Sequence, residues 1–249
     1  MEQIRQLPWL RIAAEGTAIV ISILLAFSIE AWWQTRSETD QERELLQALL
    51  DDFKATKDEI QDWRQFHLAV EKSTKALLDA TLSGDASLTQ ADLRKLLSDL
   101  TWFDSESHFA TGALNSTVNG GDLPKIQNQT LRRAIADWPT RIANAETIQR
   151  QDYEFFTQVL TPFLRAHTHL PLLAAENTAR PGDPNTVFPR VMALSADEFR
   201  LEKILDAEGF QNILMQKTWI QFDILRQIDE VEVFLDQTIA VLSEELQPR

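Results

Sequence analysis

An uncharged apolar run near the start of the chain constrains the fold more than any other feature. The run GTAIVISILLAFSI occupies residues 16–29, and Glu15 and Glu30 bracket it. A bilayer core about 30 Å thick requires roughly 20 apolar residues in a helix, so this run alone is too short to span a membrane. Its flanking residues therefore decide whether the segment crosses a bilayer.

Tryptophans flank the run at a spacing that matches a bilayer. A helix from Trp9 to Trp32 is about 35 Å long at a rise of 1.5 Å per residue. Because tryptophan prefers the headgroup level, this spacing predicts a transmembrane helix over residues 9–33, after a short tail at 1–8. The residues expected at the membrane interface are Trp9, Arg11, Glu15, Glu30, Trp32 and Trp33.

Two other interpretations of this segment remain open. Arg5 and Arg11 followed by the apolar run also fit a cleaved signal peptide, with residues 26–28 (Ala-Phe-Ser) as the cleavage triplet. A buried core helix of a soluble protein is the second alternative. The uncleaved anchor is favoured because the helical pattern continues directly through the possible cleavage point.

The chain beyond the apolar run keeps the period of a helix. Apolar and small polar residues recur at steps of three and four, which is the seven-residue repeat of a coiled coil or a long bundle helix. One helix can therefore run from the membrane into the domain, with a possible hinge near residues 37–40. This seam consists of Leu46, Leu49, Phe53, Thr56, Ile60, Trp63, His67, Val70, Thr74 and Leu77.

Capping residues and a second seam complete the fold prediction. Thr89 with Asp92, and Asn128, have the character of helix N-caps. A seam from Phe210 to Glu245 predicts a long last helix, and Pro139 and Pro162 predict kinks. The sequence therefore predicts an all-α fold, in which a transmembrane helix precedes an antiparallel bundle of long helices. The bundle domain covers residues 34–249 and contains a Pro-rich loop at 169–195.

Composition excludes several functional classes. The chain has 38 acidic and 24 basic residues, for a net charge of −14. A nucleic-acid binder needs a basic face, so no nucleic-acid partner is expected. The absence of cysteine excludes disulfides, thiolate metal sites and a cysteine nucleophile.

The four histidines do not assemble a recognisable catalytic or metal site. His167 and His169 could present two imidazoles to a metal, but zinc sites need three or four ligands. His67 falls on the first seam, where a satisfied core histidine is the simpler interpretation. His108 follows Ser105-Glu106-Ser107 but lacks the strand-turn setting of a nucleophile elbow. No catalytic, cofactor-binding or metal-ligating residue and no cofactor is therefore predicted.

Two segments resemble a known family. The sequences EGTAIVISILLAFSIEAWWQTRSETDQERELLQALLDDF (residues 15–53) and ALNSTVNGGDLPKIQNQTLRRAIADW (residues 113–138) are similar to uncharacterised bacterial proteins with one N-terminal membrane helix and a helical domain. The chain departs from that pattern at residues 30–32, which read Glu-Ala-Trp where asparagine is usual. The resemblance implies a membrane-anchored bacterial protein, and it implies no activity.

The basic residues beside the apolar run give little information about the orientation of the chain in the membrane. Arg5 and Arg11 precede the apolar run, and Arg36 and Arg43 follow it closely, so the count of basic residues is equal on the two sides. A short N-terminus inside and a large domain outside is the simpler insertion. We therefore expect a single-pass protein of the bacterial inner membrane with most of the chain in the periplasm.

These features predict a non-enzymatic interaction or scaffolding protein, such as a subunit of a membrane complex. Expected partners are membrane lipid and either a protein or a second copy of the chain. The alternatives are an extracytoplasmic helical bundle that senses a small molecule and, more remotely, a membrane-tethered hydrolase. The candidate interaction positions are Leu46, Leu49, Phe53, Ile60, Trp63, Asn119, Gly120 and Gly121.

Overall fold

The computed structural model describes residues 8–84, 88–101, 109–168, 170, 173 and 201–247, and these residues form helices and turns without any strand. The all-α prediction is confirmed for this part of the chain. The elements in order are α1 (Pro8–Ser83), α2 (Gln90–Leu100), α3 (Gly112–Asn119), the 3-10 turn η1 (Leu123–Lys125), α4 (Gln129–Phe155), the π-helical turn η2 (Phe156–Leu160), α5 (Thr161–His167), the 3-10 turn η4 (Leu201–Ile204) and α7 (Phe210–Glu245).

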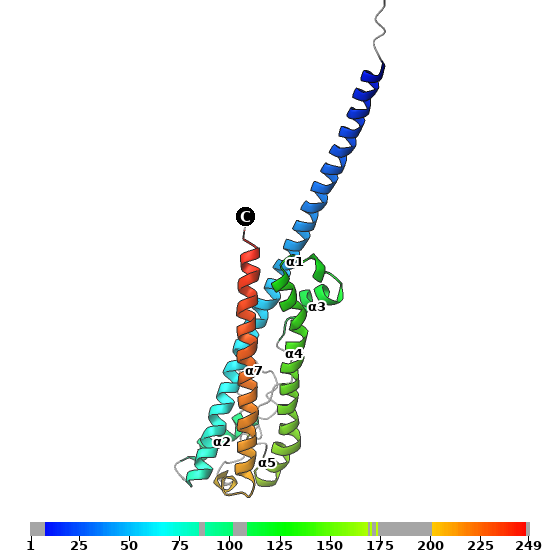
Figure 1. Ribbon diagram of the computed structural model, residues 1–249. Helices are drawn as coiled ribbons and strands as arrows, with labels where there is room; N and C mark the ends of the chain where they lie inside the picture. Colours follow the sequence, from blue (N-terminus) through cyan, green and yellow to red (C-terminus); the bar gives the residue numbers. More distant parts are fainter. Residues whose placement is uncertain are drawn as a thin grey trace, which may run out of the picture.

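The helix α1 dominates the molecule. Its 76 residues correspond to about 114 Å at 1.5 Å per residue. No proline follows Pro8 within the helix, and an added Cβ at Gly16 would meet nothing within 4 Å, so neither residue interrupts it. The helix also continues without a break through residues 37–40, where a hinge was possible. Figure 1 shows its N-terminal part projecting alone from a bundle formed by the rest of the chain.

The long helices do not simply alternate in direction. The backbone N–H of Gln127 donates to Glu42 Oε1 (2.6 Å), and the amide of Asn128 donates to Glu245 Oε1 (2.7 Å). The start of α4 and the end of α7 therefore lie together, beside the point where α1 leaves the bundle. Helix α4 runs parallel to α1, and α7 runs antiparallel to both (Figure 1).

The predicted antiparallel packing therefore holds for α7 against α1 and for α7 against α4, whereas α1 and α4 run parallel. The segment that leads into α3 lies beside residues 52–56 of α1. The N–H of Ala110 donates to Thr56 Oγ1 (3.0 Å), and the N–H of Ala113 donates to Asp52 Oδ2 (2.7 Å). Helix α4 begins after Gln127, whose N–H contacts Glu42, and it runs from there in the same direction as α1 (Figure 1).

The seam predicted on α1 is confirmed, because all ten of its residues are buried. The core consists of two hydrophobic clusters along the bundle. The cluster nearer the projecting part of α1 is centred on Phe53, Trp138 and Phe234, with ring centroids 5.4 Å apart for Phe53 and Trp138 and 5.1 Å apart for Trp138 and Phe234. The other cluster joins α1 and α2 to η2, α5, η4 and the start of α7.

Helix ends mostly follow the predicted caps. Thr89 and Asp92 form a complete capping box at the start of α2, and the side chain of Asn128 accepts hydrogen bonds from two N–H groups of α4. Gly209 precedes α7 with a φ of +86°, a conformation that glycine adopts at little cost. These predicted boundaries are confirmed.

The two prolines for which kinks were predicted occupy different positions in the helices. Helix α4 continues through Pro139, which lies on its exposed face, so no new helix begins after Trp138. Pro162 instead follows the π-helical turn η2 and stands in the first turn of α5, where a missing N–H is tolerated. Of the predicted Pro-rich loop at 169–195, all residues except 170 and 173 lie outside the described residues.

The turn after α3 depends on two glycines. A Cβ added at Gly120 would lie 2.2 Å from the backbone oxygen of Ser116, and Gly121 has a φ of +82°. We expect Gly120→Ala to lower the free energy of unfolding by about 1–3 kcal/mol, because the backbone must shift to accept the methyl group. Chemical denaturation measures this change. Gly112→Ala is the control, since its Cβ has no neighbour closer than 4.0 Å, and equal losses in the two variants would refute the strain argument.

Candidate functional site

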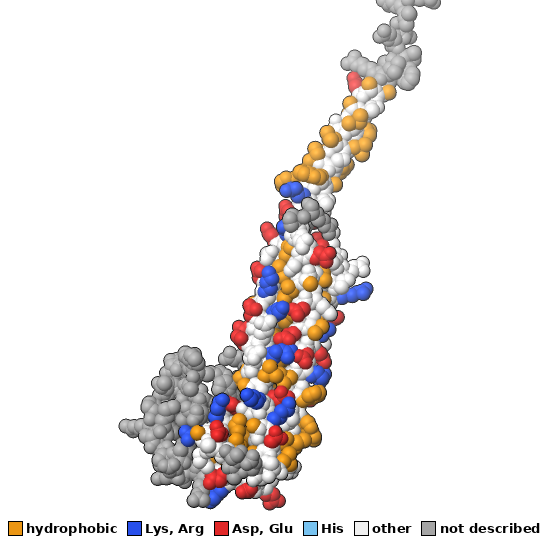
Figure 2. Space-filling view, turned by 90° about the vertical axis from the view of Figure 1, so that its left-hand side faces the viewer, with side chains coloured by type: hydrophobic (Ala, Val, Ile, Leu, Met, Phe, Trp, Pro, Cys, Tyr) orange, Lys and Arg blue, Asp and Glu red, His pale blue; other side chains and the backbone are white. Residues whose placement is uncertain are grey.

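The projecting part of α1 carries the predicted membrane segment. Within the described residues, it is the one helix long and apolar enough to cross a membrane by length and composition, with a mean hydropathy of 1.7 over its best window and no part of that window buried. This exposure argues against a core helix of a soluble protein. Figure 2 shows apolar side chains along the projection and mixed charges over the body below it.

Hydroxyl groups in this segment are satisfied within the helix. Thr17 donates to the carbonyl of Ala13 (2.8 Å), and Ser22 donates to that of Ala18 (2.8 Å). Such back-bonding leaves no hydroxyl proton to be hydrated, which lowers the cost of placing these residues in hydrocarbon. The segment is therefore chemically suited to lipid despite its Ser and Thr content.

The predicted interface residues lie at the two ends of this segment. Trp32 and Trp33 are exposed, and their ring centroids are 6.3 Å apart. Glu15 and Glu30 are exposed on α1. Trp9 and Arg11 belong to the first turns of the same helix, and their side chains lie outside the described residues.

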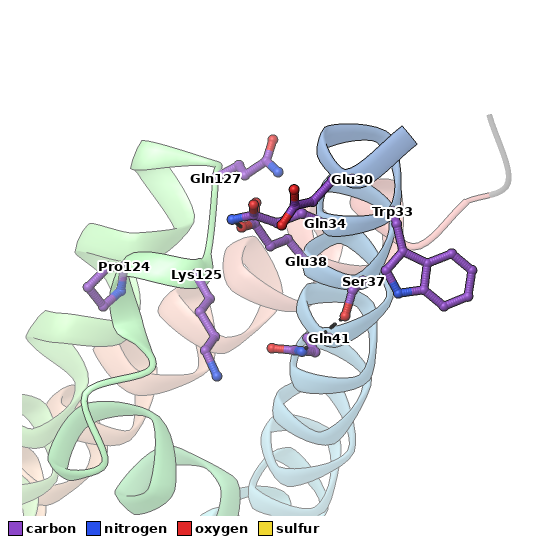
Figure 3. Close-up of a pocket in the computed structure, with 9 residues that line it drawn as sticks. All are labelled: Glu30, Trp33, Gln34, Ser37, Glu38, Gln41, Pro124, Lys125 and Gln127. Carbon is purple, nitrogen blue, oxygen red and sulfur yellow. Dashed lines mark hydrogen bonds between the residues drawn. The ribbon is translucent and has the colours of Figure 1, made fainter. Parts of the chain in front are cut away.

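A groove of about 770 Å³ lies immediately beyond the apolar segment, between α1 and η1 (Figure 3). We call it the interface groove. Glu30 and Trp33 were predicted as interface residues from the sequence, whereas the residues of the opposite wall were not predicted. The groove is lined by Glu30, Trp33, Gln34, Ser37, Glu38, Gln41, Pro124, Lys125 and Gln127.

The two walls of the interface groove differ in charge. On α1, Glu30, Gln34 and Glu38 follow one another at intervals of one helical turn, and Gln34 Nε2 donates to Glu38 Oε1 (2.9 Å). On the other wall, Lys125 Nζ lies 2.8 Å from Asp122 Oδ1. The groove therefore presents carboxylates on the α1 side and an ammonium group, paired with Asp122, on the other side.

The turn Asn119-Gly120-Gly121 lies directly before η1, and its residues are exposed. A backbone hydrogen bond from Asp122 N to Thr117 O (3.0 Å) closes it. This turn connects α3 to η1, which carries Lys125. These three residues are accessible to a partner, but they do not line the interface groove.

The candidate interaction positions on α1 are placed differently. Leu46, Leu49, Phe53, Ile60 and Trp63 are all at least 95% buried by the chain's own helices. The seam packs against α4 and α7 of the same chain. These five residues therefore belong to the core and offer no open surface to a partner.

A buried ion pair lies between the two hydrophobic clusters. Lys217 Nζ on α7 is 2.6 Å from Asp152 Oδ1 on α4, and the two side chains are 0% and 2% exposed. Burial lowers the pKa of the Lys217 ammonium from its ordinary value of 10.5, while the Asp152 carboxylate acts in the opposite direction. Among the described residues, Asp152 Oδ2 has no hydrogen-bond partner.

A second buried polar contact lies next to this pair along α7. His67 Nδ1 is 2.8 Å from Gln221 Oε1, and both residues are buried. His67 also packs edge-on against Trp63 and Phe66. The prediction that His67 is a core residue is confirmed, and its Nδ1 has a hydrogen-bond partner. Lys217, Asp152 and Gln221 were not among the residues predicted from the sequence, although Lys217 occupies a seam position where an unpaired lysine would be costly.

No metal site forms among the described residues, where no group of three or more His, Asp or Glu side chains is arranged to hold an ion. His167 is exposed, with Nδ1 2.8 Å from the carbonyl oxygen of Phe163 and its ring stacked on the Phe163 ring. His108 and His169 lie outside the described residues.

Comparison with models of known families, with curated proteins and with solved structures gives no match. The resemblance to bacterial proteins with one N-terminal membrane helix therefore stays a prediction.

Proposed function

We propose that the chain is a non-enzymatic, single-pass membrane protein whose helical bundle acts as an interaction or scaffolding module in a membrane complex. One observation carries this proposal. The exposed apolar segment and the buried seam belong to a single unbroken helix, α1. A bilayer that holds the apolar segment of α1 therefore fixes the position and direction of the bundle, as a scaffold requires.

An exposed aromatic pair on α7 supplies a contact surface. Trp219 and Phe222 are 65% and 62% exposed, and they lie about one turn apart on the face of α7 that points away from the core. Tryptophan and other aromatic residues are enriched at protein interfaces and dominate their energetics. We place the partner, a protein or a second copy of the chain, on this face.

Site-specific photo-cross-linking tests this assignment in the membrane. A cross-linker at position 219 or 222 should give an adduct, whereas one at the exposed α7 positions Asn212 or Gln237, farther along the helix, should not. Trp219→Ala with Phe222→Ala should weaken association at least about tenfold, as expected for interface anchors. A chain that stays monomeric, with no adduct at either aromatic position, would refute the proposal.

A ligand-sensing bundle is the second candidate function. It is favoured by Asp152 Oδ2 and Gln221 Nε2, which are buried and have no hydrogen-bond partner among the described residues. Buried polar atoms of this kind are usually satisfied by water or by a ligand. A small polar compound that raises the melting temperature of the wild-type chain but not of Gln221→Leu would support this candidate. A screen with no such compound would count against it.

A further inference from the structure

The interface groove starts at the boundary of the apolar segment. Glu30 is the first charged residue after the run, and Trp33 follows within one turn. The polar layer on each side of a bilayer is about 5–7 Å thick, given a core of about 30 Å in a total of about 40–45 Å. From Glu30 to Gln41 the helix rises about 16 Å. When the apolar segment spans the bilayer, the end of the groove that contains Glu30 therefore lies among lipid headgroups.

The chemistry of the groove suits a zwitterion. The α1 wall offers the carboxylates of Glu30 and Glu38, which are two turns apart, with the amide of Gln34 between them. The η1 wall offers the ammonium of Lys125, which also pairs with the Asp122 carboxylate at 2.8 Å. Figure 3 shows Gln34 and Glu38 reaching from α1 towards the η1 wall. A ligand with a cationic and an anionic end matches both walls, whereas a purely anionic headgroup would meet two carboxylates.

We propose that the interface groove binds the headgroup of an ethanolamine phospholipid. The lipid ammonium donates to Glu30 and Glu38, and the lipid phosphate pairs with Lys125. A primary ammonium has three N–H donors, as in lysine, so it can satisfy two carboxylates at once. A choline headgroup has no N–H group and cannot donate to them. This inference rests on the proposed membrane anchor, because the groove meets headgroups only when α1 spans the bilayer.

Native mass spectrometry of the full-length chain in detergent tests the proposal. Phosphatidylethanolamine should bind at least about tenfold more tightly than phosphatidylcholine with the same acyl chains, since one charge-assisted hydrogen bond accounts for about that factor. Glu30→Gln with Glu38→Gln should abolish the difference. Asp58→Asn with Asp62→Asn removes the same charge from an exposed part of α1 away from the groove, and it should retain the difference.

Three outcomes would overturn the proposal, and they differ in what else they imply. Equal binding of the two lipids by the full-length chain would overturn this inference alone. Soluble phosphoethanolamine that binds as tightly as the lipid would refute the assignment to a lipid. A chain whose mass shows that residues 1–28 have been removed would overturn the membrane anchor, and this inference with it.

Discussion

Replacing Lys217 with Met should lower the free energy of unfolding by about 3–5 kcal/mol, the typical loss when one partner of a buried ion pair is removed. The substitution keeps most of the side-chain volume, so the loss does not come from a cavity. It comes from the Asp152 carboxylate, which stays 2% exposed and loses its partner at 2.6 Å. Urea denaturation of the purified chain measures the change.

Two further variants show that the ion pair itself causes this loss. Adding Asp152→Val to Lys217→Met removes the stranded charge, and it should restore stability to within about 1 kcal/mol of the wild type or exceed it. Lys75→Met is the matched control. Lys75 pairs with Glu71 on the exposed face of α1, so this change should cost no more than about 0.5 kcal/mol. Equal losses for Lys217→Met and Lys75→Met would contradict the role of burial.

Placing two arginines in the apolar segment should release the chain from the membrane. Ile21 and Leu24 lie near the middle of the predicted transmembrane span. Both side chains are exposed on the projecting part of α1. Each arginine at the centre of a membrane helix costs about 2.5–3.5 kcal/mol, so Ile21→Arg with Leu24→Arg should cost about 5–7 kcal/mol of insertion free energy. The fraction of the chain in the membrane pellet measures this effect.

The same substitution elsewhere on α1 provides the control. Leu68 and Leu82 are also exposed, but they lie in the bundle part of the helix. Leu68→Arg with Leu82→Arg adds the same charge and should leave the chain in the pellet. Release of both double variants to the same extent would mean that charge, and not position in the span, controls membrane association.

Local sequence patterns predicted much of the fold. The seam from Leu46 to Leu77 identified the buried face of α1, because helical period and burial are both set by residues three and four apart. The caps at Thr89 and Asn128 were found for a similar reason, since a cap hydrogen bond joins residues within one turn. Such signals need no knowledge of the tertiary structure.

Contacts between distant segments were not predictable in the same way. Asp152 and Lys217 are 65 residues apart, and nothing in their local sequence states that they meet. The interface groove likewise depends on the position of η1 beside α1, which brings Lys125 and Glu38 to the same groove. The parallel direction of α1 and α4 depends in the same way on where α4 begins. A periodic pattern shows which face of a helix is buried, but it does not identify the neighbour or its direction.

The intact mass of the chain recovered from carbonate-washed membranes tests the membrane anchor most directly. We expect the washed membranes to retain a species of 28.5 kDa that still carries residues 1–28. Recovery of the chain in the wash, or a mature protein that begins at Ile29, would contradict the membrane anchor and the function proposed from it.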